Sequence, residues 1–229
     1  GCFIETLSIA SREFGLSNEI SYFPAGEDGP VAVITFSSTS EAKDPLFNCI
    51  LNRRSCKEPF SSMALSGEQI SALSNFGDVF YKNEDVEDLK KITWESWLIE
   101  YMTPRTLKES IDLMRFGKKE INLSPDGIDL GGAFLESLSL IGLMTPESMA
   151  ETGSIAYQTG IDMYNEMLNS TPNYILLKTD NNDRYAQINT GRKWARLNLK
   201  TTEMGLSIHP CSQALQEYPE MRDLYKKIH

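Results

Sequence analysis

The sequence has little of what several classes of protein need. No apolar run among its 229 residues approaches the roughly 18–20 residues of a transmembrane helix, and there are only two histidines. Its formal net charge is -10, which disfavours general binding to nucleic acid or to anionic membranes. That charge still allows a local basic pocket for a phosphate. The composition is otherwise that of an ordinary globular domain, and the length suffices for one sizeable core.

The four cysteines carry no metal or redox motif. Cys2, Cys49, Cys56 and Cys211 form no CxxC pair, and no His/Cys cluster has metal-ligand spacing. We interpret them mainly as small buried hydrophobic residues. This interpretation predicts no metal site and favours a reducing, cytoplasmic compartment. The sequence opens on Gly1 within an apparent helix body, so an N-terminal leader on a longer parent chain would be invisible.

An internal repeat connects the two ends of the sequence. Residues 1–17 read GCFIETLSIASREFGLS and residues 191–207 read GRKWARLNLKTTEMGLS, with the first Gly, one Leu, one Glu and the Gly-Leu-Ser triplet in common. Each copy predicts a helix ended by glycine, which enters the left-handed conformation of a C-cap at low cost. Two unrelated helices could share this pattern. If the repeat is real, residue 1 lies near the end of a unit that began upstream.

The coarse pattern alternates helices with fewer strands. Helices are predicted over 2–14, from Asp44-Pro45 onward, over 66–75, 84–116 with a break at Thr103-Pro104, 133–142, 146–168, 183–204 and 219–227. Strands are predicted over 19–23, 31–36, 174–178 and 206–209, and the turn-rich segment 24–30 joins the first two into a hairpin. This order predicts an α+β fold or a three-layer α/β/α sandwich.

An aromatic stripe lies on the helix predicted after residue 84. Trp94, Trp97, Leu98 and Tyr101 fall on one face at helical spacing. The stripe is typical of core packing. Its alternative interpretation is a lid over a planar ligand.

A basic segment follows the Asp44-Pro45 helix. Residues 52–57 read NRRSCK, which resembles the R-x-S-x-[RK] signature near the start of flavin nitroreductase units. In that family the basic side chains and the Ser hydroxyl hold the FMN phosphate and ribityl chain. A dianionic phosphate suits cations with several donors, and a serine adds a neutral donor. The alternative interpretation of the segment is a solvated basic turn.

A second segment strengthens the resemblance. The C-terminal part of the sequence is similar to the strand, long helix and short strand of nitroreductase units. The residues that carry this likeness are Leu176–Thr179, Asp183-Arg184, Gly191-Arg192, Arg196 and the run GLSIHPCSQ at 205–213. The likeness is strongest to the two-repeat, Acg-like subfamily. In nitroreductases the segment after the glycine packs against the flavin ring. The order of the two segments, about 150 residues apart in the sequence, supports the same family.

The resemblance implies a fold and a cofactor. The fold it implies is a nitroreductase-like three-layer α/β/α sandwich with a central, mostly antiparallel sheet. It also implies two domains: residues 1–43 are the C-terminal remnant of a first repeat plus a linker, and residues 44–229 are the second nitroreductase-like domain. FMN would lie at the interface of two repeats, take hydride from NAD(P)H and pass it to a nitroaromatic or quinone-like acceptor. The implied contacts to phosphate and ribityl oxygens are Arg53, Arg54, Ser55 and Lys57, and those lining the ring are Ser207, Ile208 and His209.

Other features of the sequence leave alternatives open. No catalytic acid–base residue is needed or found, and His209 is better explained as a structural or flavin-adjacent residue than as a general base. Arg192 and Arg196 are weaker flavin candidates, with exposed helix charges as the alternative. The basic tail and first repeat that complete the family's site are not in the sequence. An alternative function is therefore a flavin-binding or flavin-sequestering protein without turnover, and a third is a structural unit without flavin. We also expect self-association or pairing with the missing first repeat.

Overall fold

The structure is a computed structural model that describes the backbone of residues 1–229 and every side chain except that of Phe134. It is 54% helical with small sheets, which confirms the α+β class. The described strands form three two-stranded pairs, β1–β2, β3–β6 and β4–β5. The three-layer sandwich with a central sheet stays a prediction. No helix among the described residues is both long and apolar enough to cross a membrane.

The chain divides into two compact units, each assembled from separate stretches. Unit 1 comprises Gly1–Lys57, Ala64–Tyr81 and Asn173–Pro210, and unit 2 comprises Glu58–Met63, Lys82–Pro172 and Cys211–His229. This division separates the compact parts of the structure and does not test the sequence repeat. The predicted repeat boundary between residues 43 and 44 therefore stays a prediction.

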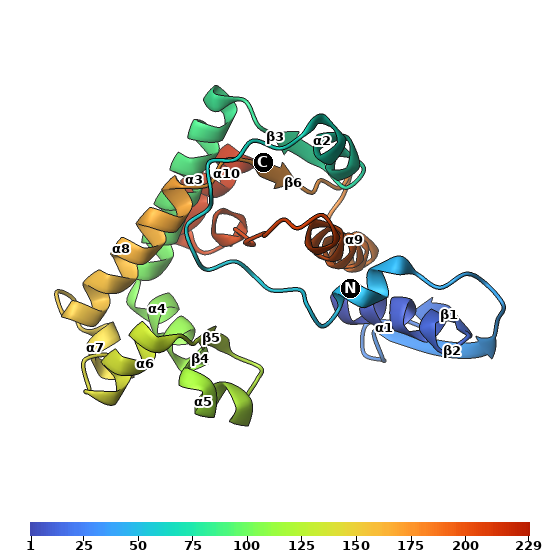
Figure 1. Ribbon diagram of the computed structural model, residues 1–229, viewed down its shortest axis with the longest axis horizontal. Helices are drawn as coiled ribbons and strands as arrows, with labels where there is room; N and C mark the ends of the chain where they lie inside the picture. The colour runs from blue at the N-terminus through green and yellow to red at the C-terminus, as the bar shows by residue number, and fades with distance from the viewer. The chain divides into compact units, whose positions relative to one another are not determined.

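Unit 1 is built around two helices that pack on each other. Its elements in chain order are α1 (Cys2–Glu13), β1 (Leu16–Tyr22), β2 (Ala32–Ser38), the 3-10 helix η1 (Pro45–Cys49), α2 (Gly67–Ser74), β3 (Asp78–Phe80), β6 (Tyr174–Leu176) and α9 (Arg184–Glu203). Strands β1 and β2 form the predicted antiparallel hairpin, and β3 pairs antiparallel with β6. Helix α9 packs against α1 and η1, as Figure 1 shows.

The two copies of the sequence repeat meet in unit 1. The first glycine of one copy lies against its counterpart, because a Cβ built on Gly191 would lie 3.0 Å from the Cα of Gly1. Equivalent apolar positions, Ile9 and Leu199, belong to one buried cluster. The glycines that end the helices, Gly15 and Gly205, both have φ 69. Both helices thus end in a left-handed glycine and pack on each other, and the repeat itself stays a prediction.

Side-chain caps set the starts of several helices in unit 1. The Ser66 hydroxyl accepts from the backbone N–H of Gln69, and the Gln69 side chain accepts from the Ser66 N–H. This reciprocal arrangement is a capping box at the start of the helix predicted over 66–75. The Asp183 carboxylate accepts from the N–H of Ala186 at 2.7 Å at the start of α9. These caps confirm the predicted beginnings of α2 and α9.

Unit 2 is mainly helical. Its elements are α3 (Asn83–Met102), α4 (Pro104–Leu113), β4 (Met114–Phe116), α5 (Gly117–Leu123), β5 (Ile128–Leu130), α6 (Ala133–Leu140), α7 (Pro146–Ala150), α8 (Ile155–Asn169), two 3-10 turns η2 (Gln213–Leu215) and η3 (Pro219–Met221), and α10 (Arg222–Ile228). Strands β4 and β5 pair in parallel. The break that Thr103-Pro104 predicts is confirmed between α3 and α4.

The aromatic stripe of α3 lies in the core of unit 2. Trp97 is buried and stacks on Tyr101 and Tyr164, with ring centroids 4.6 and 4.5 Å away, and Trp94 stacks on it at 5.6 Å. The Tyr101 hydroxyl donates to the carbonyl of Tyr157 at 3.0 Å. These contacts account for the stripe as core packing rather than as a lid.

Several predicted elements differ in the structure; residues 114–116, for example, are predicted as the end of a helix and form strand β4. The helix expected over 146–168 is two helices, α7 and α8, because Gly153 takes a φ of 88 that a right-handed helix cannot continue. The helix expected from Asp44-Pro45 is the short turn η1. The strand expected over 206–209 is a single bridge at Ile208.

Candidate functional site

The basic segment begins as soon as η1 ends. The carbonyl of Cys49 accepts from the N–H of Asn52 at 3.1 Å and from the N–H of Arg53 at 2.9 Å. These two bonds turn the chain away from η1 and into residues 53–57. We call residues 53–57 and 207–209 together the candidate site. All of them belong to unit 1.

The two halves of the candidate site are adjacent in space. Ser55 forms a parallel bridge with Ile208, and the N–H of Cys56 donates to the carbonyl of Ile208 at 2.9 Å. The Nδ1 atom of His209 lies 2.6 Å from the carbonyl oxygen of Cys56. Segments that are 153 residues apart in the sequence are therefore held together by backbone pairing and by one side chain.

The hydrogen bond of His209 determines which of its ring nitrogens carries the proton. A carbonyl oxygen only accepts, so Nδ1 carries the proton in this hydrogen bond. Burial lowers the pKa of His209, and the positive charge of Lys57 lowers it further, while the bond to the Cys56 carbonyl acts in the opposite direction. The ring is therefore held neutral near pH 7. This role is the structural one that the sequence favours over a general base.

The two arginines of the candidate site differ in their exposure. Arg53 is half-buried and Arg54 is exposed. The Nη1 atom of Arg54 donates to the carbonyls of Leu51 at 2.9 Å and of Arg53 at 2.7 Å. Neither arginine forms an ion pair with a carboxylate among the described side chains. Two guanidinium groups without an ion-paired carboxylate, followed in sequence by the Ser55 hydroxyl, are donor types that suit a phosphate.

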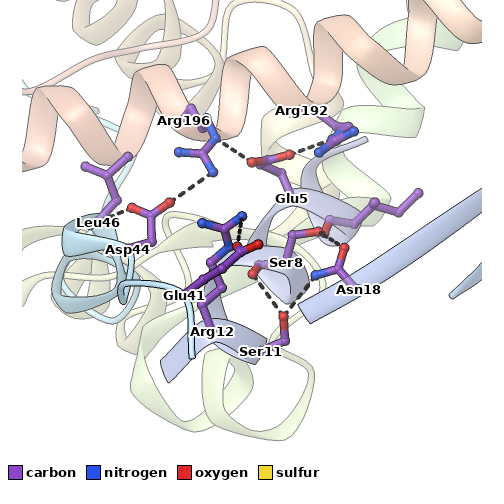
Figure 2. Close-up of polar contacts among 11 residues, drawn as sticks. Glu5, Ser8, Ser11, Arg12, Asn18, Glu41, Asp44, Leu46, Arg192 and Arg196 are labelled. Atoms are coloured by element: carbon purple, nitrogen blue, oxygen red, sulfur yellow. Dashed lines mark hydrogen bonds and ion pairs between the residues drawn. The ribbon is translucent and has the colours of Figure 1, made fainter. Parts of the chain in front are cut away.

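Arg192 and Arg196 lie in a different arrangement, which sequence reasoning missed. Figure 2 shows the Glu5 carboxylate between their two guanidinium groups. Nε of Arg192 lies 2.5 Å from one Glu5 oxygen, Arg196 binds the other oxygen, and the Nη1 of Arg192 donates to the Tyr22 hydroxyl at 3.0 Å. Glu5 is only 2% exposed. The two arginines are therefore partly exposed charges of α9 that both pair with a buried carboxylate.

Arg196 also contacts the start of η1. Its Nη2 atom lies 3.0 Å from one oxygen of Asp44, while the other Asp44 oxygen accepts from the N–H of Leu46 at 3.1 Å. Helix α9, helix α1 and η1 are thus joined by charged side chains. The spacing of four residues between Arg192 and Arg196 places both on one helix face and is the only signal of this arrangement within α9. Their partner Glu5 is far away in the sequence.

The comparisons with known proteins assign no family. No protein-family model matches the chain, and no curated protein is a significant match to its sequence. The resemblance to nitroreductases therefore depends on the motifs of the sequence alone.

Proposed function

We propose that this chain binds FMN at the candidate site, as part of a two-repeat, nitroreductase-like flavoprotein with a three-layer α/β/α sandwich. The observation that supports the proposal is the pairing of residues 55–56 with residues 208–209. The sequence resemblance places a phosphate-binding function on the first segment and a ring-binding function on the second. A single flavin mononucleotide could reach both only if the two segments were neighbours, as they are.

Each half of the candidate site has a role in this proposal. Residues Arg53, Arg54, Ser55 and Lys57 would hold the phosphate and ribityl oxygens, and Ser207, Ile208 and His209 would line the ring. His209, neutral and bonded to Cys56, would fix the ring-lining segment against the phosphate-binding one. When bound, FMN supplies hydride transfer from NAD(P)H to a nitroaromatic or quinone-like acceptor, and the protein binds and orients it.

Titration of the chain with FMN tests the binding. Hydrogen bonds to charged groups are worth about 1.5–3 kcal/mol, so Arg53→Ala should raise the Kd for FMN roughly ten- to hundredfold. Arg12→Ala is the matched control, because Arg12 is a surface arginine of unit 1 that pairs with Glu41. Its Kd should equal that of the unsubstituted chain. Equal FMN binding by the Arg53→Ala variant would refute the phosphate role.

A flavin-binding protein without turnover is the second candidate. The donors of the candidate site could hold a flavin with or without turnover, and hydride transfer through FMN needs no protein base. Anaerobic addition of NADH or NADPH to the FMN-loaded protein separates the two functions. Bleaching of the flavin absorbance indicates an oxidoreductase, and a stable yellow colour indicates sequestration.

A further inference from the structure

We propose that Glu5 is a positioning residue for the candidate site, acting through Arg196 and Asp44 on the basic segment. The inference rests on the proposed function, since it concerns the same phosphate-binding residues. It gives α1, which belongs to the first copy of the repeat, a direct role in the site of the second copy.

Glu5 first determines where Arg196 lies. The carboxylate is buried and binds both Arg192 and Arg196. A buried carboxylate is stable only when it is paired and hydrogen-bonded. The side chain of Arg196 is therefore held toward α1, with its Nη2 atom directed at Asp44 (Figure 2).

Asp44 carries this constraint into η1. One oxygen binds Arg196, and the other accepts from the N–H of Leu46 and starts the turn. Five residues later the same turn ends at Cys49, whose carbonyl accepts from the N–H of Arg53. Asp44 and Arg53 are thus connected through one short hydrogen-bonded element.

The other half of the candidate site is attached to the same helix. Arg196 lies on α9, which ends at Glu203; two residues later comes Gly205, and the N–H of Leu206 then donates to the carbonyl of Thr201 at 2.8 Å. Residues 207–209 follow at once. Arg196 therefore ties the element that leads into the basic segment to the helix that leads into the ring-lining segment.

The apolar contacts reinforce this connection. Leu46 and Cys49 of η1 share a buried cluster with Ile9 of α1 and Leu199 of α9. Leu46 and Cys49 are the buried residues of η1, and Asp44, which binds Arg196, is its N-cap. The charged contacts and the apolar cluster therefore both connect η1 with helices α1 and α9.

Three variants of the full chain test the inference. Glu5→Gln removes the buried charge, and Asp44→Asn removes the charge that Arg196 binds while keeping a good N-cap residue. Glu13→Gln is the control, because Glu13 forms an exposed ion pair between α1 and Lys43 at 2.7 Å. The binding of FMN and of riboflavin, which lacks the phosphate, is measured for each variant. Hydrogen exchange of the backbone over residues 45–57 is measured without flavin.

Selective loss of the phosphate contribution is the expected result. By analogy with supporting residues behind metal ligands, Glu5→Gln and Asp44→Asn should raise the Kd for FMN about tenfold. They should leave the Kd for riboflavin within about twofold and speed exchange over residues 45–57, while Glu13→Gln changes none of these. A purely structural role would weaken both flavins equally. That result, or unchanged exchange and FMN binding in a folded Asp44→Asn variant, would overturn the inference. If the unsubstituted chain bound no FMN, the proposed function itself would fail before any substitution was compared.

Discussion

Replacement of Glu5 by glutamine should destabilise unit 1. The substitution keeps the size of the side chain and removes the charge that pairs with Arg192 and Arg196. Breaking a fully buried ion pair costs about 3–5 kcal/mol. The arginine side chains are 32% and 40% exposed, so water still solvates them in part. We therefore expect the free energy of unfolding to fall by about 2–3 kcal/mol.

Urea denaturation followed by circular dichroism measures this loss. The double-mutant cycle with Arg196→Met isolates the pair, because in that background Glu5→Gln should cost at least about 1 kcal/mol less. Glu13→Gln, at the exposed pair with Lys43, should change the stability by less than about 0.5 kcal/mol. A loss below about 0.5 kcal/mol for Glu5→Gln would refute the reasoning that the buried carboxylate holds α1 to α9.

Three further predictions concern the core and the titrating groups. A Cβ on Gly160 would lie 2.4 Å from the hydroxyl oxygen of Tyr101, so Gly160→Ala should lower the free energy of unfolding by about 1–3 kcal/mol. The same substitution in a Tyr101→Phe background should lose much less stability. An equal loss in both backgrounds would contradict the contact. Burial in the folded state lowers the pKa of His209 below 6.5, so the stability contributed by neutral His209 should be lost as pH falls from 6.5 toward the lowered pKa. Denaturation at several pH values measures this pH dependence of stability, and His209→Asn should flatten it. Burial raises the pKa of Cys211 to about 11, so native protein at pH 8 should react with a thiol reagent quickly at exposed Cys2 and slowly at Cys211. Mass spectrometry of the labelled protein measures the two rates, and equal rates would disprove the prediction.

Local chemistry explains what could be predicted of the fold. The capping box at Ser66, the N-cap at Asp183 and the break at Thr103-Pro104 all depend on side chains within three or four residues of the backbone they affect. Such signals need no tertiary information. The division of 146–168 into two helices was missed because Gly153 can be either a tolerated helix residue or a left-handed stop. Only the surrounding packing selects between these conformations.

The candidate site was partly predictable for a similar reason. The residues of the basic segment and of the segment after Gly205 could be named because each forms a local motif. Their pairing through Ile208 and His209 is a tertiary contact. The Glu5 arrangement could not be predicted, since a single charged residue on an amphipathic helix is usually solvated. The repeat offered one hint, because it matched α1 with the part of α9 that carries both arginines.

The central claim is that this chain binds FMN through the candidate site. The most direct measurement is the visible absorbance of the full chain near 450 nm, roughly where an oxidised flavin absorbs, during titration with FMN. We predict a saturable change in the flavin band that is lost in the Arg53→Ala variant and retained in the Arg12→Ala variant. A flavin spectrum that stays that of free FMN at millimolar protein, or a change that is equal in both variants, would contradict the account.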